Sequence, residues 1–420
     1  MNVAKAKPDT YAALRIPNFR RYIVALFTLT LGLQIQGTVV GWQIYDLTHD
    51  PLALGLIGLA EALPAIGLSL FAGHFADVHD RRRIALRAMA VLVVCAAALW
   101  MLAHPAVGSL PAALRARVTI IYAVIVVTGV ARAFLQPARQ ALSVELVPRE
   151  LFANSITWRS GSWQVAAVVG PALGGVLYAI GGSVLGYAIA TVLLLVASLI
   201  LFSVRHRSPI RDLATREPMK TSLTSGLRFV FAEPVLLGAL TLDLFSVLFG
   251  GATALLPVFA AEILHTGPEG LGLLRAAPAV GAVITSVVLA KRPPFKRAGR
   301  TLLFAVAGFG LCMIGFAASR EFYLSLALLA LSGGFDMVSV VIRGVLLQLR
   351  TPEGMLGRVS AVNQIFIGSS NEIGAFESGI AAKLFGTAPS VALGGLATLG
   401  VVAVVAWRVP VLRKLRELGA

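Results

Sequence analysis

The amino-acid sequence predicts an all-α membrane protein of twelve transmembrane helices, arranged as two pseudo-symmetric six-helix bundles. Hydrophobic residues make up 57% of the 420 residues and charged residues only 13%, whereas soluble domains have roughly 45–50% and about 25%. Twelve apolar runs are each long enough to cross a bilayer, for which about 20 residues are needed. The longest polar segment divides these runs into six and six, which predicts the two bundles.

Each apolar run is one predicted helix, and short polar turns separate most of them. The predicted helices are 22–45, 54–76, 84–104, 118–140, 158–180, 183–204, 236–262, 268–291, 301–318, 322–348, 360–386 and 388–407. The predicted domains are an N-terminal bundle (1–204), a cytoplasmic linker (205–235) and a C-terminal bundle (236–420).

Basic residues gather in the turns that would lie on one side of the membrane. The clusters are at the N-terminus, Arg81–Arg83, Arg205–Arg228, Lys291–Arg300 and the C-terminus. Because Lys and Arg are retained on the cytoplasmic side, we expect both termini in the cytoplasm and a bacterial-type inner membrane as the location. Contact with lipid headgroups also accounts for the net charge of +16, so no nucleic-acid partner is expected.

The two halves of the sequence are weakly related. A shift of 204 residues superposes identical residues, and most are Gly, Pro or Arg, which fix backbone shape or charge. The superposed pairs are Gly129/Gly333, Arg139/Arg343, Leu142/Leu346, Pro148/Pro352, Gly170/Gly374, Gly175/Gly379 and Gly182/Gly386. This repeat favours two bundles of the same topology.

Polar residues inside the predicted helices follow a pattern. The third, sixth, ninth and twelfth helices have no ionisable residue at their centres, and the other eight carry charged or amide side chains. These are Gln34, Gln36, Glu61, Arg132, Gln164, Asp243, Arg275, Asp336, Arg343, Glu372 and Glu377. A charge at the bilayer centre costs at least about 2.5–3.5 kcal/mol, so we expect these eight helices to surround a wet central cavity.

The turn after the second helix has the spacing of a gating motif. Gly73 is followed by Asp77 four residues later and by Arg81 after four more. This pattern resembles the motif of the major facilitator superfamily, which implies a gate in which Gly73 allows close helix contact. Arg81 would pair with an acid such as Glu145 when the cytoplasmic side is closed. The alternative is a solvated basic turn.

The fifth helix carries Gly170, Pro171, Gly174 and Gly175. This run resembles the Gly-Pro-x-x-Gly-Gly pattern of antiporters of the superfamily, which implies a helix-packing role. Small residues allow close approach of a neighbouring helix, and ordinary packing by small residues is the alternative.

Two longer segments resemble the subgroup of siderophore exporters and related drug-efflux proteins. They are Ala131–Arg139 and Ser332–Gly379. The resemblance implies a secondary transporter that works by alternating access between two halves. The predicted function is proton-coupled efflux of a siderophore-like or drug-like amphipathic molecule by a monomer.

Proton coupling requires a carboxylate whose surroundings change with the side that it faces. The candidates are Asp243, Asp336 and Glu372, with Arg132 and Arg343 as charge partners. Further cavity or substrate candidates are Gln34, Gln36, Glu61, Trp163, Gln164 and Glu377. A structural ion pair is the alternative for each charged residue.

Other functions remain open. An importer of a nutrient or metabolite would share the fold, and a membrane scaffold or sensor would not need the buried charges. A membrane enzyme is disfavoured because no catalytic constellation is present, and no P-loop supports ATP-driven transport. We expect no cofactor and no metal site, since the histidines lack metal-ligand spacing.

Overall fold

A computed structural model describes residues 9–104, 111–206, 219–250, 252–291, 295–352 and 355–415. Its long helices are α1 (Pro17–Thr48), α2 (Pro51–Val78), α3 (Arg81–Ala103), α4 (Pro111–Glu145), α5 (Phe152–Phe202), α7 (Pro234–Gly250), α9 (Gly267–Ala290), α10 (Ala298–Ala318), α11 (Phe322–Arg350), α12 (Leu356–Phe385) and α13 (Thr387–Arg408). Shorter helices are α6 (Met219–Ala232), α8 (Leu256–Val258) and α14 (Pro410–Lys414). The described residues form no strand.

Ten stretches are long and apolar enough to cross a membrane by length and composition. One of them contains α5, whose backbone leaves the helical conformation at Gly181 and Gly182. Gly182 has φ of 60°, which favours glycine, so α5 is two crossings joined by a tight turn. Helix α12 is not among the ten, and it carries Glu372 and Glu377 within its apolar length. With these two corrections the described residues contain twelve spans, and the predicted fold class is confirmed.

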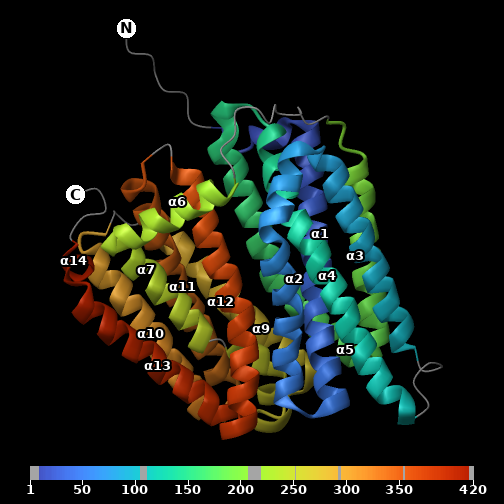
Figure 1. Cartoon of the computed structure of the whole chain (residues 1–420). Coiled ribbons are helices and arrows are strands. Elements are labelled where there is room, and N and C mark those ends of the chain that lie inside the picture. The colour runs from blue at the N-terminus through green and yellow to red at the C-terminus, as the bar shows by residue number, and fades with distance from the viewer. Residues whose placement is uncertain are drawn as a thin grey trace.

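The helices pack as two groups. Helices α1 to α5 contact one another, and helices α7 to α14 contact one another (Figure 1). The main contacts between the groups are α2 with α12 and α5 with α9. We call α1 to α5 the N half and α7 to α14 the C half.

The bundle has two ends, which we name by what lies there. The short helices α6 and α14 and the beginning of α1 lie at one end, the terminal face (Figure 1). The turn at His49 and Asp50, the break in α5 and the turn at Gly386 lie at the other end, the loop face.

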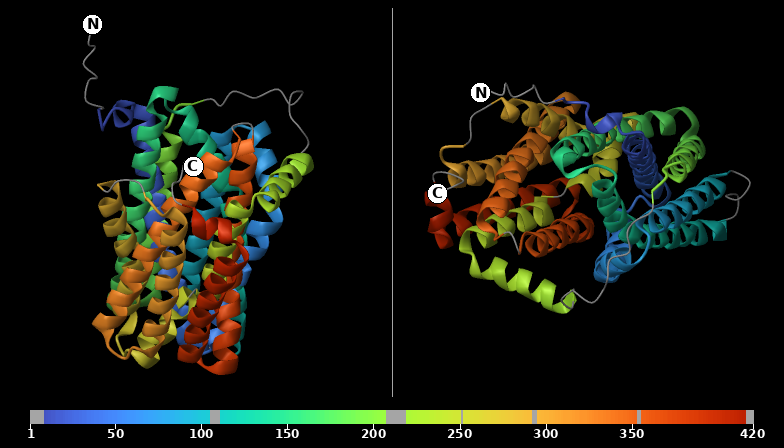
Figure 2. Two further views of the ribbon diagram at one scale, coloured as in Figure 1. Left: turned by 90° about the vertical axis from the view of Figure 1, so that its left-hand side faces the viewer. Right: turned by 90° about the horizontal axis from the view of Figure 1, so that it is seen from above.

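The halves meet at the loop face and separate toward the terminal face. The two buried apolar clusters near the terminal face each belong to one half, from Ala13 to Val204 and from Val230 to Leu415. The clusters near the loop face cross the boundary, because Val258 packs in the N-half cluster and Trp42 packs against the C-half cluster. Figure 1 shows the same divergence of the halves, and Figure 2 shows them from the side and from above. This conformation is therefore closed at the loop face.

Candidate functional site

Glycines let the two halves touch at the loop face. A Cβ built on Gly58 would lie 2.6 Å from the Cβ of Ala375, and one on Gly272 would lie 2.7 Å from the Pro171 carbonyl oxygen. Gly175 packs against Gly272 in the same contact. Such close backbone approach is possible only with small residues, so α2 meets α12 and α5 meets α9 through glycine-lined surfaces.

The other glycines of the motif on α5 pack within the N half. Gly170 contacts Gln34 of α1, and Gly174 contacts Ile35 and Thr38 of the same helix. The motif thus joins α5 to α1 on one side and to α9 on the other.

A group of charged side chains lies beside the contact between α2 and α12. Arg132 Nη1 of α4 lies 2.7 Å from Glu61 Oε2 of α2. Glu372 of α12 is within electrostatic range of both. Glu61 is one turn from Gly58, whose neighbours on α12 include the backbone of Glu372. We call Glu61, Arg132 and Glu372 the central cluster.

The central cluster faces the space between the halves. The Arg132 side chain is 46% exposed, although its partner Glu61 lies one turn from Gly58, which is in close contact with the other half. A guanidinium in contact with lipid tails would be costly. The placement therefore fits a water-filled space that opens toward the terminal face.

Arg275 of α9 crosses from one half to the other. Its Nη1 donates to the backbone oxygen of Gly37 of α1 at 2.8 Å. Glu61 lies within electrostatic range of Arg275. From the sequence, Arg275 is an intramembrane charge without a predicted role.

Asp243 and Arg343 form an ion pair inside the C half. Each side chain is 7% exposed, and the pair joins α7 to α11. Arg343 Nε has no hydrogen-bond partner among the described residues. The pair is therefore enclosed by one half rather than placed between the two.

Asp336 lines a cavity of about 190 Å³ within the C half. The lining combines hydroxyl and amide groups with Phe309 and Phe335, and Asn371 of α12 also contributes. Among the described residues, none is hydrogen-bonded to the Asp336 carboxylate or ion-paired with it. A cavity of this size has room for several waters.

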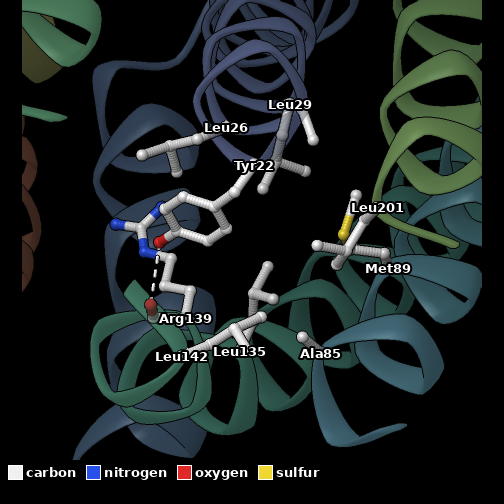
Figure 3. Close-up of a pocket in the computed structure, with 10 residues that line it drawn as sticks. Tyr22, Leu26, Leu29, Ala85, Met89, Leu135, Arg139, Leu142 and Leu201 are labelled. Carbon is white, nitrogen blue, oxygen red and sulfur yellow. Dashed lines mark hydrogen bonds between the residues drawn. The ribbon is translucent and has the colours of Figure 1, made fainter. Parts of the chain in front are cut away.

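The N half has no comparable cavity at Arg139, which the sequence repeat relates to Arg343. Figure 3 shows the Tyr22 hydroxyl pointing at the Arg139 backbone, whose oxygen accepts its hydrogen bond at 2.7 Å. The pocket around them has about 20 Å³ and a lining that is otherwise apolar. It has room for about one water, so it is too small for a substrate.

The gating motif lies at the terminal face. Arg81 at the start of α3 pairs with Glu145 at the end of α4, and both side chains are largely buried. His206 Nε2 is 3.2 Å from Glu145 Oε2. Desolvation lowers the pKa of His206, Asp80 raises it and Arg81 lowers it, and the net pKa lies below the ordinary value.

The expectations for this motif agree with the structure in part. Arg81 has the expected partner, Glu145, but the pair lies within the N half and forms while the end of the bundle at which it lies is open. We also expected Gly73 to be in close helix contact, but a Cβ built on Gly73 would meet nothing within 4 Å among the described residues. The reason is that the halves are apart here. The Asp77 side chain lies outside the described residues.

The remaining cavity candidates have different environments. Gln36 is 7% exposed and its Oε1 has no hydrogen-bond partner among the described residues. Trp163 is 49% exposed, and Gln164 lies two turns before Pro171 on the face of α5 that meets α9. Glu377 is partly buried.

Two polar contacts join the halves at the loop face. Lys383 Nζ of α12 lies 2.8 Å from Asp50 Oδ2, and the Tyr45 hydroxyl donates to Glu262. Partial burial raises the pKa of Asp50, but bonding to Lys383 and to the Leu52 N–H lowers it by more, so the net pKa is below the ordinary value. We call the Asp50–Lys383 pair the loop-face latch; it stays ionised at neutral pH.

Replacing Lys383 with Gln is expected to weaken closure of the loop face modestly. Exposed ion pairs contribute about 0.2–1 kcal/mol, which predicts an increase of roughly 1.4- to fivefold in the ratio of open to closed molecules. Spin labels on Asp46→Cys and Glu321→Cys, which lie at the loop face in different halves, would report this ratio as a distance distribution. The two native cysteines are replaced (Cys95→Ala, Cys312→Ala) in what we call the reporter chain.

The control for this measurement is Asp50→Asn. Asn keeps the cap of α2, where Asp50 accepts from the Leu52 N–H, because Asn and Asp are equally good caps. It should therefore reproduce the Lys383→Gln shift. If the ratio of open to closed molecules rose more than tenfold in either variant, or did not change in both, the modest role of the loop-face latch would be contradicted.

Sequence reasoning missed the residues that join the halves, namely Arg275, Asp50, Lys383 and Tyr45. Arg275 carried the same signal as the chosen candidates, a charge inside an apolar run. The latch residues lie at helix ends, where charges are common, and nothing in their spacing distinguishes them.

Two all-helical halves that meet around intramembrane charges, with a close glycine-lined contact at one end only, define a secondary transporter of the major facilitator class. The model of the family described as transmembrane secretion effector matches residues 8–418. The chain belongs to this family and is a multi-pass membrane protein.

The similar proteins are transporters rather than enzymes. The enterobactin exporter EntS of Shigella flexneri is 29% identical over 351 residues, which cover 82% of this chain and 80% of that one. The enterobactin exporter EntS of Citrobacter koseri is 28% identical over 349 residues, with the same coverage.

Solved structures share the fold at low identity. A D-xylose–proton symporter superposes with a TM-score of 0.72 and 13% identity, over 94% of this chain and 99% of that one. The nucleoside transporter NupG superposes with a TM-score of 0.64 and 14% identity, over 95% of this chain and 100% of that one.

Proposed function

We propose that this protein is a proton-coupled exporter of an amphipathic small molecule of the siderophore or drug-like kind. It would act as a monomer in a bacterial inner membrane, with the terminal face in the cytoplasm. Family membership and similarity to enterobactin exporters support the direction and the substrate class. The basic residues near the terminal face support the orientation.

The observation that carries the proposal is the position of Glu372. Glu372 lies on the C half, while Glu61 and Arg132 lie on the N half. Both carboxylates are therefore close to the Arg132 guanidinium only when the halves are together at the loop face. Movement of the halves would change the electrostatic surroundings of Glu372. A proton site whose surroundings differ between two conformations couples protonation to their populations.

The three acids of the sequence analysis are not equivalent in this role. Asp336 is a second candidate, since it lines a cavity that would give it access to water. Asp243 is enclosed with Arg343 in the C half, and this environment suits a structural pair better than a site that exchanges protons. We therefore propose Glu372 first and Asp336 second.

The proposed substrate space lies between the halves. Gln34, Trp163 and Gln164 from the N half and Glu377 from the C half are proposed contacts, because a large mixed lining suits amphipathic ligands. Gln36 is a further candidate through its unpartnered oxygen.

Replacing Glu372 with Gln is expected to uncouple transport from the proton gradient. Inside-out membrane vesicles from producing cells would be energised, and uptake of enterobactin and of a set of amphipathic dyes would be measured. Gradient-driven uptake should fall to the level seen with a protonophore, because a Gln side chain, unlike a carboxylate, cannot take up and release the proton. Exchange of substrate without a gradient should continue.

The control is Glu150→Gln, an exposed acid outside the proposed site, which should retain gradient-driven uptake. If a protonophore leaves uptake by the unmodified protein unchanged, proton coupling is excluded. Accumulation in right-side-out rather than inside-out vesicles would identify an importer.

A further inference from the structure

The two halves carry opposite charges at equivalent positions. A shift of 214 residues relates α2 to α9 and superposes Gly58/Gly272, Glu61/Arg275, Pro64/Pro278 and Gly67/Gly281. The shift of 204 residues relates α4 to α11 and superposes Gly129/Gly333 and Arg132/Asp336. An acid on α2 and a base on α4 thus correspond to a base on α9 and an acid on α11.

The packing of the helices supports these equivalences. Gly129 of α4 packs against the backbone of Glu61 and the ring of Pro64, and Gly333 of α11 packs against Pro278 of α9. Across the boundary, Gly58 packs on α12 as Gly272 packs on α5. The four charged residues therefore occupy related places in the two halves.

Only one of the two equivalent pairs is formed in this conformation. Arg132 and Glu61 are in contact at 2.7 Å. Arg275 instead donates to the Gly37 oxygen in the other half. No described residue is hydrogen-bonded to the Asp336 carboxylate or in direct ion-pair contact with it; it lines the C-half cavity with Arg343 only within electrostatic range.

Opening of the loop face must break the contact between Arg275 and Gly37. Helix α9 belongs to the C half and α1 to the N half, and their ends near the loop face would move apart. A guanidinium inside the membrane is costly without a partner. The N-half pair shows that side chains at these two positions can reach each other, and Asp336 occupies the matching position in the C half.

We propose that Arg275 is a positioning residue that changes partner during transport, from the Gly37 carbonyl in the loop-closed state to the Asp336 carboxylate in the loop-open state. The C-half pair then stabilises the loop-open state alone, whereas the N-half pair lies within one half and persists in both. The switch does not depend on which molecule is carried, and it requires only that the Asp336 carboxylate is ionised in the loop-open state.

A double-mutant cycle in the reporter chain tests this switch in lipid nanodiscs without substrate or a proton gradient. In the reporter chain with Arg275 unchanged, Asp336→Asn should lower the loop-open population by about tenfold. The substitution removes an ion pair that is made only in the loop-open state. In an Arg275→Gln background the same substitution should change the population by less than about twofold, since the pair is already lost. Loss of the Gly37 contact is common to both Arg275→Gln chains and cancels in the cycle.

Equal effects of Asp336→Asn in the two backgrounds would overturn the proposal, and failure of enterobactin or dye transport would not bear on it. A second variant tests the same contact in case a variant of the double-mutant cycle fails to fold. Arg275→His with Asp336→His places two metal ligands at the proposed contact, and Zn²⁺ should raise the loop-open population. No response to Zn²⁺ in the folded variant would also refute the pairing.

Discussion

Asp243→Asn is expected to destabilise the C half by about 3–5 kcal/mol, the cost of leaving one partner of a buried ion pair uncompensated. Both side chains are 7% exposed, and Arg343 already has one nitrogen without a partner among the described residues. The substitution would leave the guanidinium buried beside a neutral amide. The midpoint of thermal unfolding in detergent micelles would measure the loss.

The double replacement Asp243→Leu with Arg343→Met should recover most of that stability, since apolar residues of similar volume often replace a buried pair without cost. Glu61→Gln is the control, because its partner Arg132 is 46% exposed and exposed pairs contribute about 1 kcal/mol or less. If Asp243→Asn costs no more than Glu61→Gln, burial is not what makes the pair important.

The same double variant separates a structural from a proton-coupling role for Asp243. A chain without this carboxylate that still carries out gradient-driven uptake would limit the proton carriers to Glu372 and Asp336. A folded chain that has lost only the coupling would return Asp243 to the candidates.

Hydropathy was sufficient to predict the helices, because each crossing needs about 20 apolar residues and water-facing helices do not have them. The predicted break between 180 and 183 coincides with the break at Gly181 and Gly182, where two glycines interrupt an apolar run. The glycines of the motif on α5 were also found in advance, since small residues at helical spacing indicate close packing.

Charge partners could be predicted only in part. Arg343 pairs with Asp243, an acid of the coupling set. Arg132 has Glu372 within electrostatic range, but its direct contact is Glu61, because the rotation of α2 and α4 about their axes decides which side chains meet. The contact of Arg275 with a backbone oxygen could not be predicted from the sequence, because every residue has such an oxygen. The state of the two faces is also a property of the packed halves, which is why Gly73 was expected in a contact that this conformation does not contain.

Gly272→Leu is expected to shift the protein strongly toward the loop-open state. A Cβ at this position would lie 2.7 Å from the Pro171 oxygen, and Gly58→Leu would meet Ala375 in the equivalent contact. Overpacking costs about 1–3 kcal/mol per site, which corresponds to a population shift of roughly 5- to 150-fold. The two sites lie in separate helix contacts, so the double variant should show nearly the sum of their free energies, read as distances in the reporter chain.

Gly73→Leu provides a test with the opposite sign. A Cβ built on Gly73 would meet no described residue within 4 Å in this conformation, and the gating motif implies that Gly73 becomes tightly packed when the terminal face closes. A larger side chain should then penalise only the loop-open state and raise the loop-closed population. The control is Gly400→Leu on α13, since a Cβ built on Gly400 also meets nothing within 4 Å among the described residues. It should change neither the loop-open nor the loop-closed population. A shift in the same direction for Gly73→Leu and Gly272→Leu would mean that the two faces do not open in alternation, and the mechanism proposed for this chain would fail with it.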